Sequence, residues 1–258
     1  MKRTLYVSHG DKGGVGKSYL SMLAVEYLSQ FGHVSLIEAD PTQPDLGVRY
    51  SEMDDVTVGA LPLNQAGDAV NALSAFGEML EISNADLVVV NLPAGAGETL
   101  DGTAGMIRDL ADALGYSLIV TYALEKNRVA SDALIRSIAK GLLSVVDTDK
   151  RFVAYPEYKG KVETFDWYNR PEREKAEIGE LIVPSLANRS ALNKLEATRG
   201  RVADLVDKTN RPDGWMILDQ SSVYRWLWWT HWSRQIEGEF KLVQLLPLQR
   251  NGAAPNHP

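Results

Sequence analysis

Gly10-Asp11-Lys12-Gly13-Gly14-Val15-Gly16-Lys17-Ser18 is the stretch of sequence that decides the fold. It follows a short apolar segment, residues 4–7, and leads into a helical pattern. Closely spaced glycines let successive backbone N–H groups turn toward one point, and the positive end of the following helix adds to their field. The pattern predicts a phosphate-binding loop in which Lys17 reaches the β- and γ-phosphates and the Ser18 hydroxyl binds Mg²⁺.

The loop departs from the strict phosphate-loop pattern, because Asp11 stands where that pattern has glycine, and a second lysine, Lys12, follows it. The run from Lys12 to Ser18 resembles the deviant Walker A motif of the ParA/MinD family of dimerising ATPases. In that family the extra lysine reaches across a dimer interface to the other subunit's nucleotide, and the resemblance implies this role for Lys12. Asp11 would either repel the nucleotide or make a contact across the dimer. The loop residues assigned to ATP binding are Asp11, Lys12, Gly13, Gly14, Val15, Gly16, Lys17, Ser18 and Tyr19.

The composition fits one α/β domain with an appendage, since the chain has 258 residues, of which 45% are hydrophobic and 24% charged. A net charge of −7 does not indicate DNA as a partner. The chain has no cysteine, which excludes disulfides, thiolate metal sites and relatives with cysteine-held iron–sulfur clusters. Residues 1–3 run directly into a strand pattern without a signal peptide, and no apolar run is long enough to span a bilayer. We therefore expect a cytoplasmic protein.

Apolar strand patterns and amphipathic helix patterns alternate after the loop. The expected helices cover residues 19–31, 69–82, 98–114, 128–143 and 188–207. The expected strands cover residues 33–39, 86–92, 117–122, 151–155 and 181–184, and residues 47–67 are expected to be irregular. The alternation predicts a doubly wound, mostly parallel sheet with helices on both faces. Together with the loop, it implies the fold of a P-loop NTPase.

Asp40-Pro41 follows the expected strand 33–39 at the carboxyl end of the sheet, where ligands of open parallel sheets bind. A carboxylate there can hold Mg²⁺ through water or orient an attacking water. The pair resembles the first switch of the ParA/MinD family, in which the aspartate is needed for hydrolysis, with a second acid, Glu38, two residues earlier. An ordinary turn with aspartate at its start is the alternative. By this resemblance the catalytic residues are Lys12, Lys17 and Asp40, and the Mg²⁺ ligands are Ser18 and Asp40.

The strand 86–92 resembles the Walker B strand and second switch, but Asn91 stands where the family has aspartate. An amide keeps the hydrogen bonding and loses the charge, which predicts slow hydrolysis or reliance on Asp40 and Glu38. Alternatively, Asn91 only caps the strand end. Asn91 and Pro93 are assigned to the nucleotide site. Residues 181–184 resemble the last strand before the base-contacting loop of the family, which places the adenine against residues 184–187 and adds Pro184 to the site.

Aromatic residues gather in two places, residues 156–175 and the C-terminal part. The first mixes aromatic, basic and acidic residues, and a loop fixed by aromatic anchors is favoured over a binding surface. The second holds five of the six tryptophans: Trp215, Trp226, Trp228, Trp229 and Trp232. We expect them on a helix that packs against the domain or a partner protein, and favour this over a membrane surface because a further strand, residues 239–248, follows.

The residues thus divide into a P-loop ATPase domain (residues 1–210), a tryptophan-rich extension (residues 211–250) and a disordered tail (residues 251–258). The functional hypothesis is an ATP-hydrolysing switch of the ParA/MinD type, which forms a homodimer on binding ATP and Mg²⁺ and positions cargo in plasmid partition or conjugation. A nucleotide-gated binding module with little turnover is one alternative. A P-loop metabolic enzyme, such as a dethiobiotin-synthetase-like ligase or a small-molecule kinase, is the other. No guanine-reading motif is present, which favours ATP over GTP.

Overall fold

The structure is a computed structural model that describes residues 3–10, 12–40, 44–61 and 69–232, with side chains as far as Leu227. Asp11, the strand predicted for residues 239–248 and the tail predicted for residues 251–258 lie outside these ranges.

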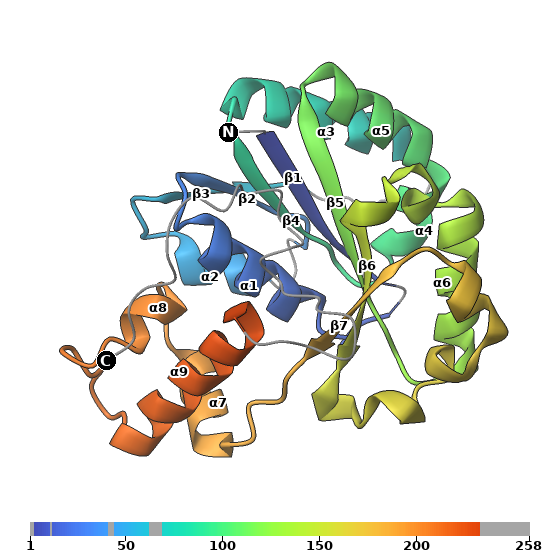
Figure 1. Cartoon of the computed structure of the whole chain (residues 1–258). Helices are drawn as coiled ribbons and strands as arrows, with labels where there is room; N and C mark the ends of the chain where they lie inside the picture. The colour runs from blue at the N-terminus through green and yellow to red at the C-terminus, as the bar shows by residue number, and fades with distance from the viewer. Residues whose placement is uncertain (1–2, 11, 41–43, 62–68, 233–258) are drawn as a thin grey trace.

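Seven strands form one sheet in which every neighbouring pair is parallel, with the order β3-β2-β4-β1-β5-β6-β7. The phosphate loop leaves the central strand β1, so it lies at the carboxyl end of the sheet between the strands that continue on either side (Figure 1). The predicted doubly wound sheet is confirmed, and in the described residues it is wholly parallel. The strands are β1 (Arg3–His9), β2 (Val34–Glu38), β3 (Val56–Ala60), β4 (Leu87–Asn91), β5 (Tyr116–Ala123), β6 (Arg151–Pro156) and β7 (Gly179–Val183).

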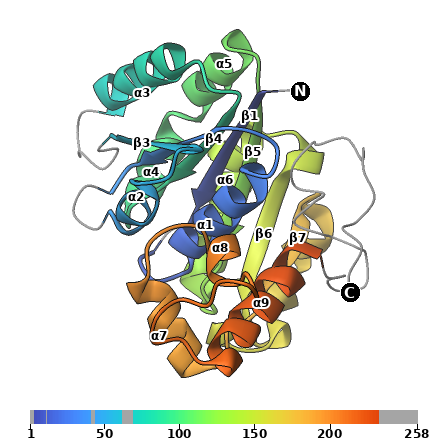
Figure 2. The ribbon, with the colours of Figure 1, turned by 90° about the vertical axis from the view of Figure 1, so that its left-hand side faces the viewer.

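Helices cover both faces of the sheet, as Figures 1 and 2 show. Successive side chains of a strand point to opposite faces, so Tyr6 of β1 packs with one layer while Leu5 and Val7 pack with the other. The Tyr6 layer contains α1 (Lys17–Leu28), α2 (Asp45–Tyr50), α7 (Arg189–Ala197), α8 (Val202–Leu205) and α9 (Ile217–Trp232). The other layer contains α3 (Ala69–Ser83), α4 (Ala96–Gly102), α5 (Ala104–Ala113) and α6 (Arg128–Lys140).

Three sequence-based predictions were wrong in detail. Residues 47–67 are not irregular throughout, because α2 reaches Tyr50 and β3 pairs in parallel with β2. The helix predicted over residues 98–114 is two helices that meet at Thr103. The helix predicted over residues 188–207 is likewise interrupted between α7 and α8, where Gly200 has a φ of 86°. That left-handed conformation, which favours glycine, turns the chain between the two helices.

Residues 157–175 form four short 3₁₀ turns around two buried aromatic side chains. Phe165 and Trp167 are fully buried, and Phe165 meets Tyr155 of β6 edge to face at 5.3 Å between ring centroids. The segment is therefore a loop fixed by aromatic anchors, which is the interpretation that the sequence favoured.

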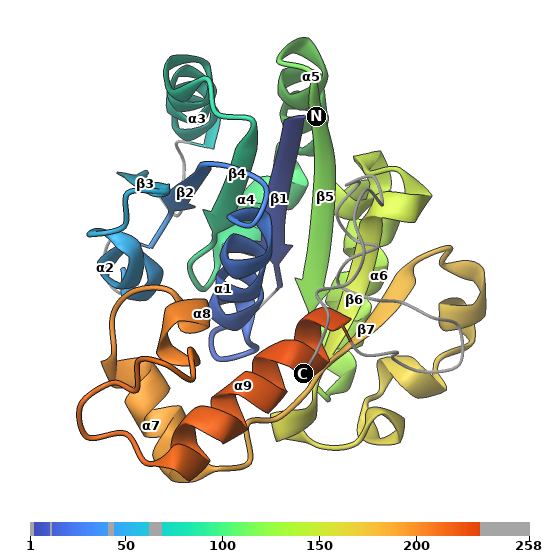
Figure 3. The ribbon, with the colours of Figure 1, turned by 60° about the vertical axis from the view of Figure 1, so that its left-hand side comes forward.

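The described part of the tryptophan-rich extension packs on the domain. Helix α9 lies beside α1, α7 and α8 (Figure 3). Trp215 and Trp226 join the same hydrophobic core as the α1 residues. Asp219 of α9 accepts a hydrogen bond from Lys194 of α7 at 2.5 Å, which ties the two helices together. Within the described residues, no helix is both long enough and apolar enough to cross a membrane.

Candidate functional site

The phosphate loop joins β1 to α1 and leaves the first backbone amides of α1 free of a side-chain cap. Gly16 has a φ of 98°, a left-handed conformation that glycine adopts without a steric penalty. The first turn of α1 contains no acidic residue, so no carboxylate within that turn weakens the positive end of the helix, which favours a bound anion. Lys17 is buried, and its ammonium donates to the Lys12 carbonyl at 2.7 Å. The loop is therefore folded around its own lysine, and no side chain caps the start of the helix that follows it.

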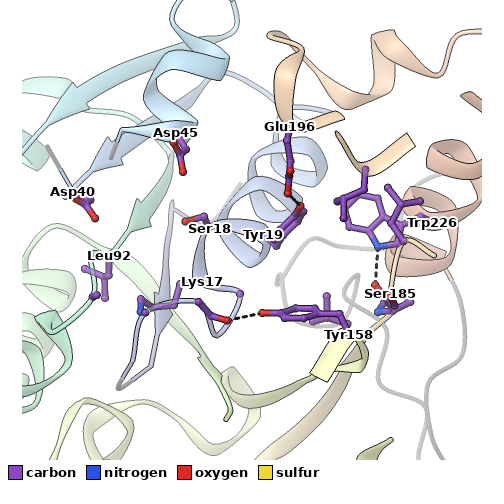
Figure 4. A pocket seen from close by; sticks show the side chains of 18 residues that line it. Lys17, Ser18, Tyr19, Asp40, Asp45, Leu92, Tyr158, Ser185, Glu196 and Trp226 are labelled. Carbon is purple, nitrogen blue, oxygen red and sulfur yellow. Dashed lines mark hydrogen bonds between the residues drawn. The ribbon is translucent and has the colours of Figure 1, made fainter. Parts of the chain in front are cut away.

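A cavity of about 490 Å³ opens at this loop, and Figure 4 shows the side chains that line it. Its volume is in the range of small-molecule sites. Of the residues assigned to the nucleotide, the cavity is lined by Gly13, Gly14, Gly16, Lys17, Ser18, Tyr19, Asp40 and Pro184. The sheet and the loops thus bring the phosphate loop, the first-switch aspartate and the loop after β7 to one place.

Three assigned residues do not line the cavity. Val15, Asn91 and Pro93 are buried. The Lys12 side chain is exposed and also lies outside the lining, although its carbonyl holds Lys17.

Tyr158 lies across the phosphate loop, a contact that the sequence did not predict. Its hydroxyl donates to the Gly14 carbonyl at 3.0 Å, and it comes from the 3₁₀ turn that follows β6. A Cβ at Gly16 would meet that hydroxyl at 3.2 Å, so Gly16 also makes room for the tyrosine. Burial raises the pKa of Tyr158 to about 12, so this phenol stays protonated and able to donate.

The far end of the cavity is built from side chains of α1, α7 and α9. Tyr19 donates to Glu196 at 2.8 Å, and its ring meets the indole of Trp226 edge to face at 6.1 Å between centroids. Trp226 donates its indole N–H to the Pro184 carbonyl at 2.8 Å. Burial, reinforced by Glu196, raises the pKa of Tyr19 and keeps its hydroxyl a donor. The loop that the resemblance places against adenine is therefore held by the tryptophan-rich helix.

Two further acids lie near this cavity. Asp45, at the start of α2, lines it opposite Ser18 (Figure 4). Glu38, at the end of β2, is buried behind Asp40 and accepts a hydrogen bond from the Asn91 amide at 2.9 Å. Burial raises the pKa of Glu38. The oxygen of the Asn91 amide is buried without a hydrogen-bond partner in the described part of the chain.

No protein-family model matches the sequence. Over 116 residues the chain is 30% identical to Protein MobD of Acidithiobacillus ferrooxidans, a match that covers 42% of this chain and 48% of that protein. The chain thus spans about half the length of this curated relative.

Two solved structures have a similar fold. One is a nucleotide-binding protein from Archaeoglobus fulgidus in complex with ADP, with a TM-score of 0.47 and 14% identity over 75% of this chain and 85% of that one. The other is the MinD cell division protein of Aquifex aeolicus, with a TM-score of 0.43 and 17% identity over 86% of this chain and 95% of that one.

The chain has the fold of a P-loop NTPase, and its phosphate loop resembles the deviant Walker A motif of the ParA/MinD family. The parallel sheet order and the glycine-rich turn between β1 and α1 define the fold, and the two lysines of that turn carry the resemblance. The P-loop residues also fit Mg²⁺, because Ser18 and Asp40 supply oxygen ligands to one cavity and Mg²⁺ retains several of its own waters.

Proposed function

We propose that this protein is an ATP-binding and ATP-hydrolysing switch of the ParA/MinD type. One observation carries the proposal: Lys17, Ser18 and Asp40 line the same cavity. This cavity lies at the N-terminus of α1, which has no side-chain cap. A lysine, a hydroxyl and a carboxylate around a nest of amides supply what phosphoryl transfer requires, which is positioning and neutralisation of charge. In this proposal Lys17 binds the β- and γ-phosphates, Ser18 binds Mg²⁺ and Asp40 orients the attacking water.

Lys12 supports a dimeric form of this switch. Its side chain is exposed on the phosphate loop and makes no hydrogen bond or ion pair with any residue that the structure describes. Its exposure beside the site and its absence from the cavity lining support a contact with a second copy. We propose that ATP closes a homodimer in which Lys12 of each copy contacts the nucleotide of the other, and that hydrolysis opens it.

The Asn91 amide favours slow turnover. A carboxylate at this place would strengthen the Mg²⁺ water shell, and the amide supplies only a neutral acceptor. The same observation favours one competing function, a nucleotide-gated binding module with little hydrolysis. We rank it second, because Asp40 lines the cavity and Glu38 lies directly behind it.

The proposed cargo is part of a conjugation or plasmid-partition apparatus. The partial match to Protein MobD supports a conjugation-associated member. A partner protein would dock at the tryptophan-rich end, where Trp226 already contacts the Pro184 loop of the site. Such a partner would sense the nucleotide through that loop.

Light scattering combined with an ATPase assay tests the proposal. We expect the protein to be a monomer without nucleotide and with ADP, and a dimer with ATP and Mg²⁺. Lys17→Ala should abolish both nucleotide binding and dimerisation. Lys12→Ala should still bind ATP and remain a monomer.

The matched control is Lys161→Ala, an exposed lysine outside the cavity, which should behave as the unmodified protein. ATP binding with dimerisation but without phosphate release would select the binding module. Failure to bind ATP would overturn both proposals.

A further inference from the structure

The 3₁₀ turn that follows β6, residues 157–159, contacts two loops of the nucleotide cavity at once. The Tyr158 hydroxyl donates to the carbonyl of Gly14 in the phosphate loop at 3.0 Å. The carboxylate of the preceding residue, Glu157, accepts from the backbone amide of Ser185, in the loop after β7, at 3.2 Å. This turn, here called the 157–159 bridge, therefore joins the phosphate loop to the loop that the family resemblance places against the base.

The bridge is itself held by contacts outside the cavity lining. Lys159 forms an ion pair with Glu125, in the loop after β5, at 2.6 Å. The Gly160 amide closes the turn by donating to the Glu157 carbonyl at 2.9 Å. The φ of Gly160 is 135°, a conformation that glycine adopts without a steric penalty. Tyr158 thus reaches the phosphate loop from a turn that is anchored to its own neighbours.

The hydrogen bond from Tyr158 fixes one peptide unit of a glycine-rich loop. Gly14 and Gly16 both have a positive φ, 69° and 98°, and glycine loses more conformational freedom on ordering than any other residue. The C=O of Gly14 and the N–H of Val15 belong to one planar trans unit, so they point in opposite directions. Holding the Gly14 carbonyl therefore also sets the direction of the Val15 amide. Phosphate loops bind their ligand through such backbone amides.

The Tyr158 side chain also forms part of the cavity wall. It is 49% exposed, and it lines the cavity together with Ser18 and Ser185 (Figure 4). The hydroxyl end of the ring contacts the phosphate loop, and the backbone end adjoins Glu157, which holds Ser185. The ring therefore lies between the two loops and offers an aromatic surface on which a nucleoside can pack.

We propose that Tyr158 is a positioning residue of the nucleotide site. In the ligand-free protein its hydroxyl holds the peptide unit between Gly14 and Val15 in the orientation that binds phosphate, and its ring packs against the nucleoside once the nucleotide is bound. This inference rests on the proposed function, because it names a residue that positions the proposed ligand. A surface contact without a role in binding is the alternative, and it predicts that variants of Tyr158 bind as tightly as the unmodified protein.

Calorimetric titration with ATP and with inorganic tripolyphosphate, each in the presence of Mg²⁺, tests the two roles separately. Tripolyphosphate has the phosphate chain of ATP without the nucleoside, so its affinity reports on the phosphate loop alone. Tyr158→Phe removes only the hydroxyl and should weaken the binding of both ligands by about fivefold. Tyr158→Ala also removes the ring. It should weaken ATP binding by a further factor of about five or more and tripolyphosphate binding no further.

Tyr168→Phe is the matched control. Tyr168 belongs to the same segment after β6 and is partly buried, but it does not line the cavity, so this variant should bind both ligands as the unmodified protein does. The two ligands are compared on one protein at a time, so the difference between them does not depend on a change in the stability of the variant.

The outcomes separate this inference from the proposed function. If Tyr158→Phe bound tripolyphosphate as tightly as the unmodified protein, the hydroxyl would not position the phosphate loop. If Tyr158→Ala lost no more affinity for ATP than for tripolyphosphate, the ring would not contact the nucleoside. Binding of ATP without saturable binding of tripolyphosphate would overturn the orientation of the loop in the ligand-free protein. Failure of the unmodified protein to bind either ligand would instead overturn the proposed function, and this inference with it.

Discussion

Asn91 and Glu38 face each other across the strands β4 and β2, where they are register partners, and the Asn91 amide donates to the Glu38 carboxylate at 2.9 Å. Asn91 is 2% exposed and Glu38 is 1% exposed. The amides of Asp40 and Gly47 also point to Glu38, each at 3.3 Å. The carboxylate that the family resemblance leads one to expect on β4 is thus absent, and the neighbouring strand carries one instead.

Asn91→Asp should destabilise the protein. The substitution replaces a donor by a second carboxylate against Glu38, and the pair must repel or take up a proton. Loss of the donor to a buried charged group costs roughly 1–3 kcal/mol of unfolding free energy. Urea unfolding at neutral pH measures this directly.

The matched control exchanges the two groups. Asn91→Asp combined with Glu38→Gln keeps one carboxylate and one amide in contact across the same strands. It should recover most of the stability lost in Asn91→Asp alone. If Asn91→Asp alone were as stable as the unmodified protein, the hydrogen bond from Asn91 to Glu38 would not contribute to the free energy of unfolding.

Because Glu26 is buried with a raised pKa, we expect the free energy of unfolding to fall as the pH rises. This glutamate of α1 accepts from Tyr50 at 2.7 Å and from the Val202 amide at 2.8 Å, and burial raises its pKa above the ordinary value. The folded state then binds more protons than the unfolded state, so its contribution is complete below about pH 4 and declines as pH rises toward the folded pKa. Thermal unfolding of Glu26→Gln across this range should lack that decline, whereas Glu78→Gln, on an exposed face of α3, should keep it.

At Asp219 we expect the opposite pH dependence, with a loss of unfolding free energy as the pH falls. Hydrogen bonds from Lys194 and from the Met216 amide lower its pKa to about 2. Its stabilising contribution is therefore present above the unfolded pKa of about 4 and is lost as pH falls from about 4 to about 2. Asp219→Asn should be less stable than the unmodified protein at neutral pH, and the difference should shrink through this acid range. Asp213→Asn, an exposed neighbour, should show no such change.

The core of the fold could be predicted because each sequence pattern that indicates it lies within one short segment. The glycines and the lysine of residues 13–17 mark the loop, and continuous apolar runs mark β4 and β5. Strand β3 was missed because it is short, lies at the sheet edge and exposes part of its length. The break at Thr103 was missed because buried residues at Leu100, Ala104 and Ile107 keep a helical period across it.

The candidate site could be predicted only where its residues lie in the loop or directly after a strand. Tyr158 lies 144 residues from Gly14, and Glu196 lies 177 residues from Tyr19. No pattern within either segment indicates a partner at such a distance, and the contacts arise from the order of the strands. Tryptophan density did mark the C-terminal helix, but the sequence did not show that Trp226 reaches the Pro184 loop.

Trp226→Phe should weaken nucleotide binding more than it weakens the fold. Phenylalanine keeps an aromatic ring beside Tyr19 but cannot donate to the Pro184 carbonyl, so the loop against the base loses its anchor. A neutral hydrogen bond contributes about 1 kcal/mol, which corresponds to a loss of about fivefold in affinity for a fluorescent ADP analogue. Trp215→Phe is the matched control, because Trp215 is also buried in this core but does not line the cavity. Equal affinities in the two variants would mean that α9 supports the core alone and has no part in holding the nucleotide loop.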